Sequence, residues 1–247
     1  MLEPRAESSA VEEARRRMDG VARVVVRPIA SPVALGLYGL AAGTIVLAGQ
    51  QLGWVDPGER KPVALILVAF PFLAQLVASL WSTLARDGVA STAMGVLALT
   101  WLSTGLVQFA TPPGSTSDGL GLLLLFSSIA MALTGVTACQ SKVLLGVVFL
   151  VAATRFALGG LHQLTANEAW EDAAGIVGLV LFFLAVYAAF AGEIEDAQGK
   201  TLLPMGRRMK GRLAVDGSLA EQLKHAPTSR EFGSSCKAAD DRTRCHV

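Results

Sequence analysis

The chain has 247 residues, of which 52% are hydrophobic and only 17% are charged, and its net charge is +1. Soluble domains usually carry about 25% charged residues, and proteins that bind nucleic acid are usually strongly basic. The composition therefore argues against a soluble domain and against nucleic acid as a partner. The stretch from Val33 to Gly192 is nearly free of charge, which is typical of helices in a lipid bilayer.

The first 30 residues lack the apolar core of a cleaved signal peptide and are predicted to form an N-terminal tail, which the distribution of Lys and Arg places in the cytoplasm. We expect a helix here, with a basic cluster at Arg15, Arg16 and Arg17. This cluster has two interpretations, contact with anionic lipid headgroups or simple solvation. Residues 209–247 are predicted to be a polar, partly disordered tail. The odd number of cysteines, three, indicates no disulfide framework and suits a reducing cytoplasm.

Six apolar segments have the length of about 20 residues that a helix needs to cross the bilayer. Helices are favoured because each satisfies its own backbone hydrogen bonds in lipid. The sequence therefore predicts an all-α membrane protein, with a domain over 31–208 of six transmembrane helices joined by short loops. The predicted spans are about 33–53, 62–84, 89–110, 119–139, 143–163 and 173–192.

The distribution of Lys and Arg predicts the orientation. Of the 21 Lys and Arg residues, 18 lie on the side that holds both ends of the chain, whereas only Arg60 and Lys61 lie on the other side. Since cytoplasmic loops carry the excess of positive charge, both termini are predicted to be cytoplasmic. The protein is then a multi-pass protein of the cell (plasma or inner) membrane.

Arg155 is the one basic residue within a span, slightly beyond its middle toward the outside. An arginine at the centre of a helix costs about 2.5–3.5 kcal/mol on insertion scales and usually faces a bundle interior or water. A guanidinium there is suited to attract a carboxylate in bidentate fashion. Two alternatives remain, a structural arginine bonded to helix-end carbonyls and one that snorkels to the outer interface.

Other polar residues inside the spans have two interpretations. Gln75, Ser79 and Ser82 follow one face of the second span, and Thr100, Thr104 and Gln108 follow one face of the third. Such stripes line an aqueous path or join helices to each other. Gly36, Gly39 and Gly43 indicate close packing of the first span. Pro71 predicts a kink in the second.

Acidic residues lie at the two ends of the sixth span. Glu168, Glu171 and Asp172 are placed in its first turn, where the helix dipole favours them. Glu193, Glu195 and Asp196 come at its end, where the dipole is unfavourable. We expect this second group to pair with Lys200, Arg207 or Arg208; a proton-relay role is the alternative for either group.

Motifs of known enzyme classes are missing from the sequence. His162 stands alone at the outer end of the fifth span, and Cys236, Cys245 and His246 have spacing that does not suit a metal. We therefore predict no enzyme activity, no metal and no cofactor.

Two motifs resemble the acetate uptake transporter family, also called succinate–acetate permeases. The stretch Ser31-Pro32-Val33-Ala34-Leu35-Gly36-Leu37 is similar to the family signature Asn-Pro-Ala-Pro-Leu-Gly-Leu, with Ser31 and Ala34 as departures. The second motif comes after Tyr187 in the last span and resembles the family ending Gly-Arg-Thr-Val-Leu-Pro-hydrophobic-Gly. Its matching residues are Gly199, Thr201, Leu203, Pro204 and Gly206.

The resemblance covers about residues 28–208 and implies a transporter or channel for small carboxylates such as acetate and succinate, linked to protons. It also implies a hexamer in which each subunit has its own pore with hydrophobic constrictions. Arg155 is not part of the general family pattern and suggests a branch with altered selectivity. The predicted substrate path consists of Pro32, Leu35, Gly36, Leu37, Gln75, Thr100, Thr104, Arg155 and Tyr187.

Two alternative functions belong to other classes. One is a membrane scaffold or regulator that kept the fold and lost conduction, as the eroded first motif suggests. The other is a channel for a small neutral solute such as ammonia.

Overall fold

The structure is a computed structural model that describes residues 31–198 and 203–207. The predicted N-terminal helix, the tail over 209–247, Gly199 and Thr201 lie outside these residues. The described elements are α2 (Val33–Gln51), η1 (Pro57–Glu59), α3 (Arg60–Leu67), the π-helical turn η2 (Val68–Phe72), α4 (Leu73–Leu84), α5 (Gly88–Ala110), α6 (Asp118–Cys139), α7 (Val143–Thr165) and α8 (Glu168–Gln198).

Six helices of the described part are long and apolar enough to cross a membrane, because η1, α3, η2 and α4 form one span over Pro57–Leu84. The predicted all-α membrane fold is thereby confirmed. The sixth helix is longer at both ends than the apolar segment alone predicts. The added turns carry polar residues such as Glu168 and Gln198, which the apolar segment does not include.

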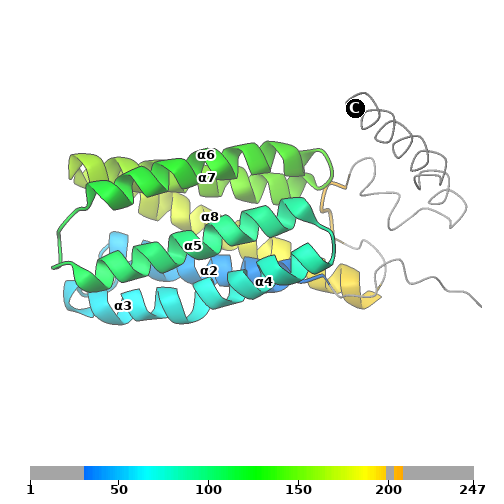
Figure 1. Cartoon of the computed structure of the whole chain (residues 1–247), viewed down its shortest axis with the longest axis horizontal. Coiled ribbons are helices and arrows are strands. Elements are labelled where there is room, and N and C mark those ends of the chain that lie inside the picture. Colours follow the sequence, from blue (N-terminus) through cyan, green and yellow to red (C-terminus); the bar gives the residue numbers. More distant parts are fainter. Residues whose placement is uncertain (1–30, 199–202, 208–247) are drawn as a thin grey trace, which may run out of the picture. The chain divides into compact units, whose positions relative to one another are not determined.

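The six spans lie side by side (Figure 1), and the contacts between them close into a ring. In the order of contacts, α2 is followed by the α3–α4 span, then by α5, α6, α7 and α8, and α8 packs again on α2. We call the end where α2 begins and α8 ends the termini end, and the opposite end the far end. The ring arrangement leaves an interior to which every span contributes one face.

Capping and local chemistry explain where the helices begin and bend. Asp87 accepts a hydrogen bond from the N–H of Ala90 (3.0 Å) before α5, and Ser117 accepts one from the N–H of Leu120 (3.4 Å) at the start of α6. Both satisfy N–H groups that lack a partner in the first turn. Pro71 lies within the π-helical turn, because proline cannot donate the regular backbone bond.

Glycines permit the closest helix contacts, as predicted for α2. A Cβ atom on Gly39 would lie 2.9 Å from the Cβ of Ala74, and one on Gly43 would lie 2.9 Å from the ring of Trp101. The contact between α6 and α7 is similar, since a Cβ on Gly160 would lie 3.0 Å from the carbonyl oxygen of Gly121. Backbones therefore approach one another as they do in membrane helix bundles.

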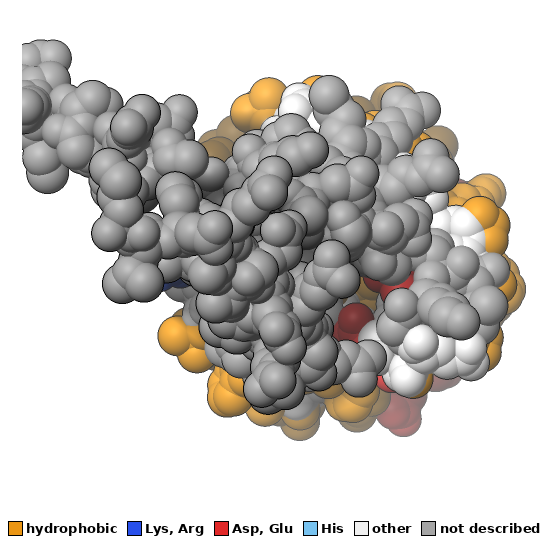
Figure 2. All heavy atoms as spheres, turned by 90° about the vertical axis from the view of Figure 1, so that its right-hand side faces the viewer, with side chains coloured by type: hydrophobic (Ala, Val, Ile, Leu, Met, Phe, Trp, Pro, Cys, Tyr) orange, Lys and Arg blue, Asp and Glu red, His pale blue; other side chains and the backbone are white. Residues whose placement is uncertain are grey.

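Large apolar side chains cover the outside of the ring. Leu122, Phe126, Leu133 and Phe183 are all more than 60% exposed, and a view from the termini end shows hydrophobic side chains around the rim of the bundle (Figure 2). A soluble protein rarely exposes so much continuous apolar surface, whereas lipid covers it without cost. The chain is a multi-pass membrane protein.

Candidate functional site

A cavity of about 730 Å³ occupies the far end of the ring, and all six spans contribute to its wall. Helix α2 supplies Gln50 and Gln51 at its end, and α5 supplies Trp101 and Thr104. The helices position these groups because each ends at the far end and turns one face toward the interior. Further lining residues are Leu47, Trp54, Asp56, Arg60, Gln108, Leu120, Leu124, Arg155, Phe156, Gly159, His162, Gln163, Glu168 and Glu171.

Arg155 lies in the wall of this cavity and is only 3% exposed. Its Nη2 donates a hydrogen bond to Oε1 of Gln51 (3.1 Å), and its Cζ lies 5.9 Å from the centre of the Trp101 ring, a distance suited to a cation–π contact. Nε has no partner. Among the described residues, no carboxylate pairs with this guanidinium.

The position of Arg155 differs from both alternatives drawn from the sequence. Its side chain lies inside the ring and neither snorkels to an interface nor bonds to helix-end carbonyls. It comes ten residues before the end of α7, so it lies about 15 Å below the far end at 1.5 Å per residue. A buried cation without a counter-ion is costly, and a guanidinium so placed is chemically suited to meet an anion.

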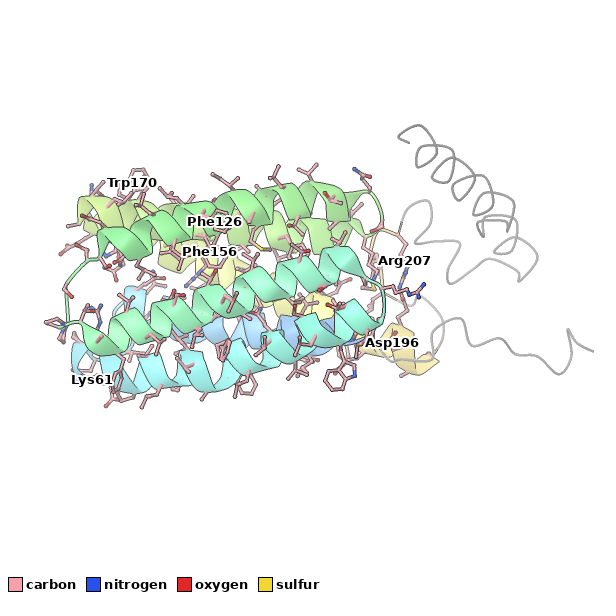
Figure 3. The ribbon with its side chains drawn as sticks, viewed as in Figure 1. Lys61, Phe126, Phe156, Trp170, Asp196 and Arg207 are labelled. Carbon is pink, nitrogen blue, oxygen red and sulfur yellow. The ribbon has the colours of Figure 1, made fainter. Side chains whose placement is uncertain are left out.

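Apolar side chains form a layer beside the cavity on the side of the termini end. The rings of Trp101 and Phe156 meet edge to face with their centres 6.5 Å apart, and Phe156 lies near the middle of α7 (Figure 3). Further toward the termini end, the buried core includes Met94, Leu97 and Phe149. Arg155 therefore lies at the floor of the cavity, next to this apolar layer.

Amide side chains form the wall between the floor and the rim. Gln108 donates to Oε1 of Gln50 (2.6 Å), which joins α5 to α2, and its own Oε1 is buried without a partner. Gln163 accepts a bond from the N–H of Ser117 (2.9 Å). Neutral amides of this kind hydrogen-bond water or a carboxylate without adding charge.

Charged groups of both signs surround the rim. Arg60 donates to Oγ1 of Thr111 (3.3 Å) and to the carbonyl of Ser115 (3.4 Å), so it ties the second span to the loop before α6. Nε2 of His162 lies 3.5 Å from a carboxylate oxygen of Glu171. The rim is thus mixed in charge, whereas the floor holds Arg155 alone among charged lining residues.

The structure brings only Thr104 and Arg155, of the nine residues predicted to form a path, into the cavity wall. Gln75 is fully buried between helices and donates to the carbonyl of Gly36 (3.2 Å). Thr100 shares a hydrogen bond with Ser127 (2.9 Å). In these two cases the polar residues join helices.

The residues of the first motif also differ in burial, because they lie on different sides of one helix. Gly36 and Leu37 are buried in helix contacts, Pro32 is half-buried, and Leu35 is 45% exposed on the outside of the ring. Tyr187 is 37% exposed. These residues lie outside the cavity wall, because successive residues of a helix turn by about 100° and only one side faces the interior.

Three important groups of the site were missed from sequence, namely Trp101, Gln50 and Gln51. The available signal was the pair of adjacent amides at the end of an otherwise apolar helix. The contact of Gln51 with Arg155 was not visible, because the two residues are separated by 104 positions in the chain.

The termini end is held by the last described residues of the chain. Arg207 pairs with Glu195, with its Nε 2.9 Å from Oε2, which confirms the predicted partner for Glu195 alone. Glu193 of the same group instead accepts a hydrogen bond from the hydroxyl of Tyr38 (2.9 Å). Asp196 and Arg207 both lie at this end (Figure 3). The carbonyls of Gly206 and Met205 accept bonds from the N–H groups of Val143 (3.1 Å) and Leu144 (3.3 Å). The second motif therefore caps the start of α7.

Comparison with known proteins decides the family. The family model described as the GPR1/FUN34/yaaH family matches residues 16–205, which is most of the chain. The chain belongs to the GPR1/FUN34/yaaH family. This membership confirms the resemblance drawn from the two motifs.

Proteins with related sequences are found in two fungi. Ammonia transport outward protein 2 of Saccharomyces cerevisiae is 26% identical over 187 residues, which cover 70% of this chain and 64% of the relative. Acetate permease A of Emericella nidulans is 24% identical over 203 residues, covering 74% and 67%. The chain thus matches about two thirds of the length of these curated relatives.

A solved structure shares the fold. The bacterial acetate channel SatP aligns with a TM-score of 0.65 and 23% identity, over 72% of this chain and 99% of the channel. At this identity the likeness shows the six-helix fold of the family.

Proposed function

We propose that this protein is a transmembrane transporter or channel for small carboxylates, with acetate as the first candidate and succinate as a second. The observation that carries the proposal is the Arg155 guanidinium, which lies at the floor of a cavity without a carboxylate partner among the described residues. Family membership and the names of an acetate permease and an acetate channel among similar proteins support it.

The chemistry follows from the order of groups along the cavity. A carboxylate enters between amide side chains, loses part of its water, and meets a guanidinium whose field is strong because the surroundings are apolar. The nearby apolar layer then opposes passage of the charged form. Binding must remain weak enough for release, and transfer of a proton to the carboxylate would lower the barrier of the layer. Proton linkage is thus part of the proposal.

Orientation and assembly belong to the same proposal. The far end, with its cavity, faces the outside, and both termini face the cytoplasm in the plasma or inner membrane, as the distribution of Lys and Arg predicts. The exposed apolar surface of the ring is available to lipid and to further copies of the chain. The family resemblance suggests a hexamer.

Uptake of labelled acetate into proteoliposomes tests the proposal. Arg155→Gln should raise the half-saturating acetate concentration about 10- to 150-fold, since hydrogen bonds to charged groups contribute about 1.5–3 kcal/mol. Arg86→Gln is the matched control, because Arg86 is exposed in the loop before α5. Wild-type protein that takes up no short carboxylate would refute the transport proposal, and an unchanged Arg155→Gln variant would remove Arg155 from the mechanism.

The apolar layer beside Trp101 favours two other candidates. A neutral molecule such as ammonia crosses an apolar layer more easily than an ion does, and one fungal relative is named for ammonia transport. Solute flux that excess acetate does not inhibit would indicate this function. A scaffold without conduction is the other candidate, and absence of any flux from correctly folded protein would favour it.

A further inference from the structure

The side chain of Arg155 rests directly on the backbone of α8 at Gly178. A Cβ atom built on Gly178 would lie only 2.7 Å from Nε of Arg155 and 3.3 Å from its Nη2. The first distance is shorter than any ordinary nonbonded contact. Only glycine at this position therefore leaves room for the guanidinium as it is placed.

A second glycine one turn away holds the hydrogen-bond partner of Arg155. A Cβ on Gly175 would lie 2.8 Å from Cγ of Leu52 and 3.3 Å from Cβ of Gln51. Residues three apart share one face of a helix, so Gly175 and Gly178 form a shallow groove, which we call the glycine groove. Gln51 of α2 and Arg155 of α7 lie in it side by side.

The glycine groove determines which edge of the guanidinium is free. Nε and Nη2 lie against Gly178, and Nη2 also donates to Gln51. Nη1 makes no hydrogen bond to the described residues and is not among the fully buried atoms. Because Arg155 lines the cavity, Nη1 is the nitrogen that remains for a ligand.

Gly178 also lies at the depth of the cavity floor. It is ten residues from the start of α8 at Glu168, which places it about 15 Å from the far end. Arg155 lies at about the same depth on α7. The glycine groove and the guanidinium are therefore parts of one level of the ring, next to Trp101.

We propose that Gly178 and Gln51 are positioning residues of the anion site, which hold the Arg155 guanidinium against α8 so that its Nη1 end faces the cavity. This inference rests on the proposed function for its ligand, a small carboxylate that approaches the guanidinium end-on. It assigns to α8 a role in selectivity that the motifs of the sequence do not indicate.

The first test measures uptake of labelled acetate by Gly178→Ala. Displacement of the guanidinium should raise the half-saturating concentration about tenfold, the effect of losing one charge-assisted hydrogen bond, with little change in maximal rate. Gln51→Leu should act in the same direction because it removes the acceptor of Nη2. Gly192→Ala on the same helix is the control, since a Cβ there meets nothing within 4 Å, and its uptake should match wild type.

The second test needs no transport and uses thermal melting in detergent. Gly178→Ala should lower the melting temperature, and Arg155→Leu, whose side chain ends before the position of Nε, should remove roughly half or more of that loss by abolishing the clash. The contact of the new methyl group with Ala48 (3.2 Å) is common to both backgrounds and cancels in the comparison. An equal loss in both backgrounds would overturn the inference, as would unchanged acetate affinity in Gly178→Ala.

The two tests separate this inference from the proposed function. If wild-type protein transports no carboxylate but Arg155→Leu relieves the Gly178→Ala loss, the transport proposal fails and the positioning role stands. If wild-type protein transports acetate and no relief occurs, the positioning role fails and the transport proposal stands.

Discussion

The pair of Glu195 and Arg207 offers a test of how the chain is held together at its termini end. Glu195 is the fourth residue from the end of α8, and the side chains of both partners are only 7% exposed. Arg207 Nε donates to Oε2 (2.9 Å), and its Nη2 pairs with the other carboxylate oxygen. Two parallel bonds of this kind make a strong, geometrically specific contact.

Glu195→Gln keeps the shape of the side chain and removes its charge. Removing one partner of a buried ion pair costs about 3–5 kcal/mol, because the other charge stays buried. The lower value applies here, since Gln retains one oxygen as acceptor. The change also relieves a carboxylate at a helix C-terminus, a gain of about 0.3–1 kcal/mol. We therefore expect a net loss of about 2 kcal/mol in the free energy of unfolding.

Thermal melting of the purified protein in detergent measures this loss. At about 2–4 °C per kcal/mol for a chain of this size, Glu195→Gln should melt about 4–8 °C below wild type. Asp196→Asn is the matched control, because Asp196 is exposed at the same helix end and shares the dipole effect without the ion pair. If both variants melt at the same temperature, the ion pair does not stabilise this end and the reasoning is wrong.

Two further predictions concern packing and orientation. Thr100→Val leaves the hydroxyl of Ser127, which is 1% exposed, without its partner, and should cost about 1–3 kcal/mol; the exposed Thr137, which bonds only within its own helix, provides the control Thr137→Val. In a chain whose native cysteines are replaced by serine, Pro113→Cys at the far end should react with an impermeant maleimide added to intact cells, whereas Gln140→Cys should react only after permeabilisation. The reverse pattern would show that the termini lie outside.

Much of the fold was predictable because lipid imposes simple rules on a sequence. A spanning segment must satisfy its own backbone and must have about 20 apolar residues, so length and composition suffice to predict six helices. The pairing of Glu195 was also predictable, since a carboxylate at an unfavourable helix end needs a cation and Arg207 is near in sequence. Arg155 stood out because charge inside a span is costly.

The site itself depended on which face of each helix turns inward. The spans are apolar on all sides, so their composition does not distinguish a face toward lipid from a face toward the interior. Leu35 therefore seemed equivalent to Leu37, yet one is exposed and the other is buried. Gln75 and Thr100 seemed to line a path, yet they join neighbouring helices.

Sequence alone determined that this chain crosses a membrane six times and carries an arginine within its fifth span. Only the tertiary structure decided that Arg155 meets Gln51 and Gly178, residues of two other helices, at the floor of a cavity. The physical reason is that membrane helices associate through close contacts of small residues. Such contacts depend on the rotation and depth of each helix in the ring, which the apolar character of a span does not specify.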